Sequence, residues 1–91
     1  MTTYASQKGE LIWRRIGDEI VIITSDGMAT HILNKTAARI WELCESGLDT
    51  PDIVNHLHNQ FDIPDEQART DVSEVISQLL NLGLIKGMAG A

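Results

Sequence analysis

Residues 10–47 constrain the fold of this chain more than any other part of its sequence. Three short runs rich in apolar and β-branched residues follow one another there, at residues 11–16, 19–24 and 28–33. Only a Gly-Asp pair and a Ser-Asp-Gly triplet separate these runs, and such connections are typical of tight hairpins. The segment therefore predicts a three-stranded antiparallel meander, in which the second run, apolar on both faces, is the central strand.

The third predicted strand has an open edge. It contains neither proline nor a charged side chain, which are the usual devices that prevent another strand from pairing. Nothing later in the sequence resembles a strand that could cover this edge. An open edge can accept a second polypeptide as an added strand. From the residues alone, this role is as well supported as the alternative, in which the third strand is simply short or is covered by the N-terminal segment.

After the meander, three helices are expected, each with an apolar stripe at helical spacing. Asn34 is the expected N-cap of the first, with Thr36 as the alternative, and Gly47 ends it. Thr50 is expected to cap the second helix, with Pro51 in its first turn. The three stripes comprise Ala37, Ile40, Trp41, Leu43 and Cys44, then Ile53, Val54, Leu57 and Phe61, then Ala68, Val72, Val75, Ile76, Leu79 and Leu82.

The sequence is organised as one α+β domain, because 91 residues have room for one modest core. Residues 1–9 are expected to be a flexible N-terminal segment, residues 10–86 the folded domain and residues 87–91 a flexible tail. Leu84 and Ile85 are expected to fold back onto the core after the third helix ends.

Composition and charge exclude several classes of function. The net charge is −6, and the seven Lys and Arg residues are scattered, so the backbone-phosphate contacts of a nucleic-acid-binding protein are disfavoured. No apolar run approaches the roughly 20 residues that a membrane-spanning helix needs. The N-terminus lacks the apolar stretch of a signal peptide, so we expect a cytoplasmic protein.

The sequence contains no motif for catalysis or for metal binding. His56 and His58 point about 200° apart on a helix, so they cannot share an ion, and His31 has no second ligand nearby. Cys44 falls in an apolar stripe, where a small core residue is expected. Phosphate-binding loops, catalytic triads and CxxC pairs are absent. We therefore expect a protein that is not an enzyme and that needs no cofactor.

The third strand and the third helix together suggest a binding groove. Beyond its core stripe, this helix presents Asp71, Glu74 and Gln78 at helical spacing. If the helix flanks the strand, a guest peptide could pair with the strand and place alternate side chains in the groove. One alternative is a winged-helix transcription regulator, although the third helix has only Arg69 as a basic residue. Another is a structural subunit that forms a homodimer through the outer sheet face, with Trp13 at the contact rather than in the core.

Several segments, in a fixed order, carry a family resemblance. They are Trp13-Arg14-Arg15 and residues 17–22, 31–34, 36–43, 47, 50–61 and 71–85. In their order and spacing they resemble the pyrroloquinoline quinone biosynthesis protein D family (PqqD), over roughly residues 10–86. The fold of this family recurs as the recognition element for precursor peptides of ribosomally synthesised, modified natural products (the RiPP recognition element).

The resemblance implies a winged-helix-like domain without catalytic residues. Such a protein binds the leader region of a precursor peptide and presents it to a maturation enzyme, such as a radical SAM protein or a leader peptidase. The leader would add as a strand beside the third strand and against the third helix. The peptide-binding residues implied are Met28, Ala29, Thr30, His31, Ile32, Leu33, Asp71, Glu74, Val75, Gln78 and Leu79.

Overall fold

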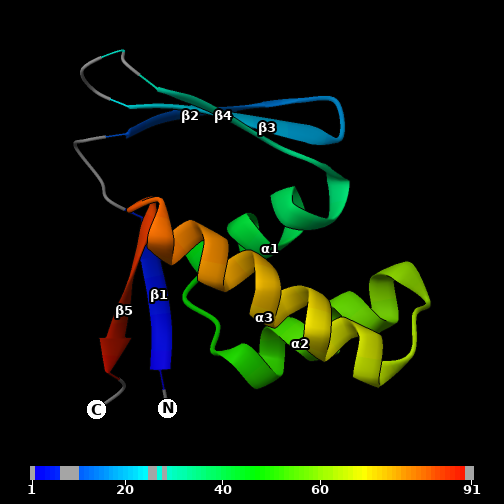
Figure 1. Cartoon of the computed structure of the whole chain (residues 1–91). Helices are drawn as coiled ribbons and strands as arrows, with labels where there is room; N and C mark the ends of the chain where they lie inside the picture. Colours follow the sequence, from blue (N-terminus) through cyan, green and yellow to red (C-terminus); the bar gives the residue numbers. More distant parts are fainter. Residues whose placement is uncertain (1, 7–10, 25–26, 28, 90–91) are drawn as a thin grey trace.

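A three-stranded sheet lies over three helices, and a separate two-stranded sheet stands at one end of the molecule (Figure 1). The computed structural model describes residues 2–6, 11–24, 27 and 29–89. The elements are, in order, β1 (Thr2–Ser6), β2 (Leu11–Ile16), β3 (Glu19–Thr24), β4 (Thr30–Leu33), α1 (Lys35–Glu45), α2 (Thr50–Phe61), α3 (Asp65–Asn81) and β5 (Ile85–Ala89). The α+β fold class and the order of meander and helices are confirmed.

The predicted meander forms the larger sheet, in the order β2-β3-β4, with both pairs antiparallel. Gly17 adopts a left-handed φ of 60°, which the tight turn between β2 and β3 requires. The third strand is shorter than expected: β4 begins at Thr30, and Met28 lies outside the described residues. Ala29 precedes β4 because its N–H donates to the Thr24 hydroxyl (3.1 Å), which takes the place of a ladder bond.

The core lies between the inner face of this sheet and the helices. Ile20, Ile22 and Leu33 are buried there, and the apolar stripes of all three helices pack against them. Leu84 and Ile85 fold back into the core as expected, with exposed fractions of 1% and 2%. The prediction that Leu82 belongs to the apolar stripe of α3 is wrong. Leu82 is the C-cap that follows the last helical residue, and its side chain is 52% exposed.

Local capping signals position the helices. The Asn34 side chain accepts the Ala37 N–H at 2.9 Å, which confirms the expected cap of α1. For α2 the expected cap was wrong by one residue. Asp49 is the N-cap and accepts the Asp52 N–H at 3.1 Å, so Thr50 is already the first helical residue. The carboxylate of Asp49 reaches a free N–H of the first turn, which Thr50 inside the helix does not do.

The pairing of the chain ends was not expected. Residues 1–9 and 87–91 were predicted to be flexible segments, yet β1 pairs with β5 in antiparallel register from Thr2↔Ala89 to Ser6↔Ile85. Ile85 is buried and Tyr4 is partly buried against the core. One side chain from each of the two strands therefore attaches the β1–β5 sheet to the rest of the molecule. The limits of the domain at residues 10 and 86 stay a prediction. The β1–β5 pair does not cover β4, because it forms a sheet of its own.

Candidate functional site

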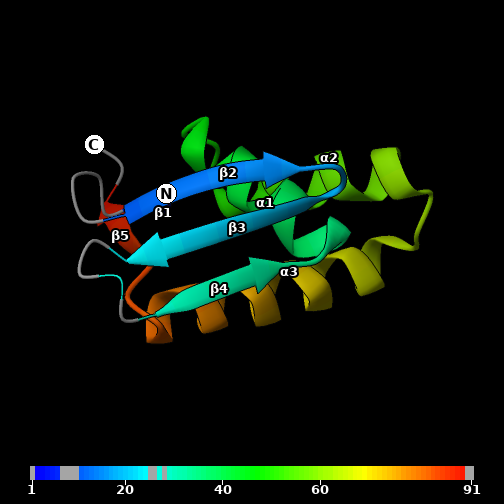
Figure 2. The ribbon, with the colours of Figure 1, turned by 90° about the horizontal axis from the view of Figure 1, so that it is seen from above.

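The strand β4 is an edge of the three-stranded sheet. Among the strands that the structure describes, it pairs with β3 alone. Figure 2 shows β4 at one side of the sheet, with α3 running along the same line on the helix side. The sheet therefore leaves one side of β4 without a strand, as expected from the sequence.

The hydrogen bonds between β3 and β4 identify the backbone groups that remain vacant. The Thr24 N–H donates to the Ala29 carbonyl at 3.1 Å, at the start of the ladder. Hydrogen-bonded and non-hydrogen-bonded pairs alternate along an antiparallel ladder. Because Ala29 is bonded to β3, every second residue after it faces β3 as well. His31 and Leu33 therefore direct their N–H and C=O groups toward β3. The intervening residues direct theirs away from the sheet.

Thr30 and Ile32 are the residues with outward-directed backbone groups. Their side chains lie on the outer face of the sheet, where Ile32 is 66% exposed. The side chains of His31 and Leu33 point to the opposite face, toward the helices. A guest strand beside β4 would thus bond with the Thr30 and Ile32 backbone. Its own side chains would alternate between the outer face and the helix side.

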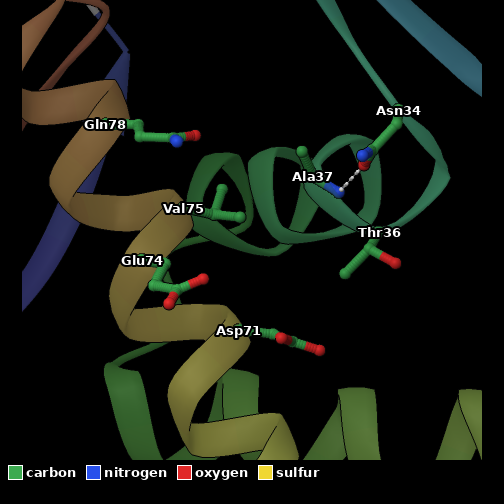
Figure 3. Close-up of a pocket in the computed structure, with 7 residues that line it drawn as sticks. All are labelled: Asn34, Thr36, Ala37, Asp71, Glu74, Val75 and Gln78. Carbon is green, nitrogen blue, oxygen red and sulfur yellow. Dashed lines mark hydrogen bonds between the residues drawn. The ribbon is translucent and has the colours of Figure 1, made fainter.

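A cavity of about 320 Å³ lies where β4 ends, between the first turn of α1 and the middle of α3. It is lined by Asn34, Thr36, Ala37, Asp71, Glu74, Val75 and Gln78 (Figure 3). In that view Asp71, Val75 and Gln78 extend from α3 toward α1. The cavity combines an apolar part, formed by Val75 and Ala37, with a rim of carboxylates and amides. Such a site suits a peptide side chain better than a buried cofactor.

Four of the predicted site residues, Asp71, Glu74, Val75 and Gln78, come together in this cavity. Leu79 does not reach it, because its side chain is 1% exposed and belongs to the core. Leu33 is likewise buried, while Thr30, His31 and Ile32 form β4 itself. Ala29 lies just before the strand, and Met28 is outside the described residues.

The first turn of α1 supplies the lining residues that sequence reasoning missed. Asn34 was assigned only a capping role, Ala37 was placed in the core stripe, and Thr36 was only a rival cap. Their signal was their position: they directly follow the edge strand, so they border any groove at its end.

Cys44 and the possible metal ligands are the groups that chemistry at this protein would first be sought in. Burial raises the pKa of the Cys44 thiol to about 12, and the nearby charge of Glu45 adds to the rise. The thiol therefore stays protonated and is a poor nucleophile. No group of His, Cys, Asp and Glu among the described residues could hold a metal ion. Within the same residues, every helix is too short or too polar to cross a membrane.

The outer face of the sheet is a second apolar surface. Its exposed isoleucines are Ile12, Ile16, Ile23 and Ile32. Three of them surround a hollow of about 210 Å³ together with Val21 and Arg14. The sequence left open whether Trp13 packs under the helices or covers this face, and the structure decides for the helix side. Trp13 points to the helix side, where its ring meets Trp41 edge to face at 6.0 Å, although it remains 38% exposed.

Sequence comparison places most of the chain in one family. Residues 19–85 match the family described as coenzyme PQQ synthesis protein D (PqqD). A relative from Methylococcus capsulatus (strain ATCC 33009 / NCIMB 11132 / Bath), named PqqA binding protein, is 34% identical over 74 residues. That alignment covers 81% of this chain and 75% of the relative. The matched region includes both β4 and α3.

Two solved structures share the fold. TbiB1, in complex with the TbiA(beta) leader peptide, superposes with a TM-score of 0.82 at 22% identity, over 94% of this chain and 99% of that one. Lasso peptide synthetase B1, complexed with the leader peptide, superposes with a TM-score of 0.80 at 18% identity. That superposition covers 91% of this chain and 96% of the synthetase chain. At this identity the likeness concerns the fold, whereas the sequence match over residues 19–85 establishes the relationship. The chain belongs to the PqqD family.

Proposed function

We propose that this protein is a non-catalytic peptide chaperone, which binds the leader region of a ribosomally made precursor peptide by strand addition at β4. The observation that carries the proposal is the vacant edge of β4, with the outward backbone groups of Thr30 and Ile32, beside the cavity on α3. Backbone hydrogen bonds would hold the guest, and the cavity would select among its side chains.

The relatives support this choice of guest. The Methylococcus capsulatus relative is named for binding PqqA, and both structural neighbours were solved with leader peptides. The cavity, with its mixed apolar and polar lining, suits an extended peptide. A deep enclosed pocket for a small substrate is not needed for such a role.

Presentation of the leader to a maturation enzyme completes the proposed function. A tethered leader raises the effective concentration of the rest of the precursor at the enzyme, without any chemistry in this protein. The enzyme would be a radical SAM protein or a leader peptidase. The proposed location is the cytoplasm, where ribosomal products are released.

Amide chemical shifts test the proposed site directly. The ¹⁵N-labelled protein is titrated with synthetic Methylococcus capsulatus PqqA and, separately, with the TbiA(beta) leader. We expect the largest shifts at Thr30 and Ile32 and along α3 from Asp71 to Gln78, because these residues border the added strand. Shifts confined to β2, or no saturable shift with either peptide, would contradict the proposal.

The outer sheet face supports self-association as a second candidate property. Its four exposed isoleucines form one apolar surface of the kind that often marks a protein contact. Light scattering across a concentration series measures the oligomeric state, and Ile12→Ser should lower any dimer fraction. The molar mass of a monomer at every concentration in both proteins would reject this candidate.

A further inference from the structure

Two carboxylates in the cavity lack a counter-ion within the described part of the chain. Asp71 is partly buried and Glu74 is exposed, and both line the cavity beside β4. Within the described residues, neither side chain forms an ion pair or a hydrogen bond. The groove thus presents two negative charges three residues apart on one face of α3.

The cations of the flanking helices are engaged elsewhere. On α1, Lys35 lies over the Phe61 ring at 5.6 Å from its centroid, and Arg39 donates to the Gln60 side chain at 2.7 Å. On α3, the only basic residue is Arg69, which bonds Asp65 at 2.7 Å. The start of α1 also faces the cavity, but its dipole amounts to about half a positive charge, less than the two carboxylates. The cavity is therefore electronegative.

The geometry of β4 decides which guest residues meet these charges. Directly opposed residues in a sheet share a face. Guest residues opposite His31 and Leu33 therefore point to the helix side, and those opposite Thr30 and Ile32 point to the outer face. The cavity lies at the Leu33 end of β4, so the helix-facing guest residue at that end is the one beside the carboxylates.

We propose that the protein selects guest strands with a lysine or arginine at this helix-facing position. Adjacent guest positions are apolar, because they extend the outer face next to the exposed Ile32. A long basic side chain packs its methylenes on Val75 and brings its charge to Asp71 and Glu74. This inference rests on the proposed function, since it specifies which peptides the same edge accepts.

Selection from random peptides tests the inference without a known guest. A display library of random dodecapeptides is selected on wild-type protein and on Asp71→Asn/Glu74→Gln, which keeps side-chain shape and removes both charges. We expect wild-type binders to be enriched in Lys or Arg at one position flanked by apolar residues, and variant binders to lack this enrichment. The best wild-type peptide should bind the variant roughly five- to tenfold more weakly at low salt.

The matched control is Asp52→Asn/Glu66→Gln, which changes the net charge equally. Asp52 lines a different cavity, between α2 and α3, and Glu66 lies in the first turn of α3. We expect this control to bind the selected peptide as the wild type does. A second measurement uses wild-type protein alone: replacement of the peptide's basic residue by glutamine should weaken binding by the same factor.

The outcomes separate this inference from the proposed function. Selected peptides that shift the Thr30 and Ile32 amides but show no basic enrichment overturn the charge selection and leave strand addition intact. An equal loss of affinity in the control variant also overturns it, because net charge alone would then explain binding. A selection that yields no binder, or only binders that leave those amides unmoved, overturns both.

Discussion

The two edges of the three-stranded sheet differ although they belong to one meander. The backbone groups of Ile22 face β4, so those of its partner Trp13, and of Arg15, point outward from β2. Both side chains are anchored to α1: Trp13 packs on Trp41, and Arg15 pairs with Glu42 at 2.7 Å. The β2 edge is thus arginine-bearing and attached to a helix. The β4 edge is uncharged and borders a cavity.

This difference shows how one sheet can present a single docking edge. Charged side chains along a strand oppose pairing with another chain, and β2 carries two arginines. On β4 the side chains are Thr, His, Ile and Leu, so nothing there opposes a guest. Both edges carry outward-directed backbone groups, and the longer β2 has no fewer of them than β4. Side-chain charge and the space beside each strand distinguish them.

The largest expected effect comes from removing an outward donor on β4. Thr30→Pro deletes one N–H that a guest would use and leaves the β3 ladder intact, so peptide affinity should fall roughly tenfold or more. Arg15→Pro is the matched control on β2 and should retain affinity. Titration calorimetry with a bound leader peptide measures both. Equal losses in the two variants would erase the distinction between the edges.

Two helix caps separate stability from binding. Asn34→Ala and Asp49→Ala each remove a side chain that accepts a first-turn N–H, so each should lower the free energy of unfolding by about 1 kcal/mol. Only Asn34 borders the cavity, so only Asn34→Ala should also weaken peptide binding. Urea denaturation gives the stabilities. A binding loss in Asp49→Ala of the same size would show that stability, not the groove, controls affinity.

The apolar part of the cavity should contribute a smaller, local effect. Val75→Ala removes two methyl groups from the groove and should weaken peptide binding about threefold. Leu82→Ala is the control, because Leu82 is an exposed apolar residue just after α3 that does not line the cavity. Fluorescence anisotropy of a labelled leader compares the two. A larger loss of affinity in Leu82→Ala than in Val75→Ala would indicate that the peptide does not bind at the middle of α3.

The smallest expected effect concerns the anchoring of β2. Arg15→Ala breaks a partly exposed ion pair with Glu42, which is worth at most about 1 kcal/mol of stability. Thermal unfolding should therefore change little, and peptide affinity should stay the same. New amide shifts at β2 during a peptide titration of this variant would indicate that Arg15 alone keeps that edge closed.

Local signals in the sequence predicted much of this molecule. Alternating apolar runs and two short turns defined β2, β3 and β4, and Asn34 and Gly47 marked the ends of α1. Helical spacing also placed Asp71, Glu74 and Gln78 on one accessible side of α3, and the family resemblance added Val75 to the site; all four line the cavity. These features depend on residues a few positions apart, so the sequence carries them directly.

Only the tertiary structure decided the contacts between distant segments. The pairing of β1 with β5 joins the two ends of the chain, and neither strand has a strong β pattern alone. The inward position of Trp13 and the contribution of Thr36 and Ala37 to the cavity likewise depend on where α1 packs. Short-range periodicity determines which elements form. Their mutual packing, set by the burial of side chains from the whole chain, determines which edge stays open and what lies beside it.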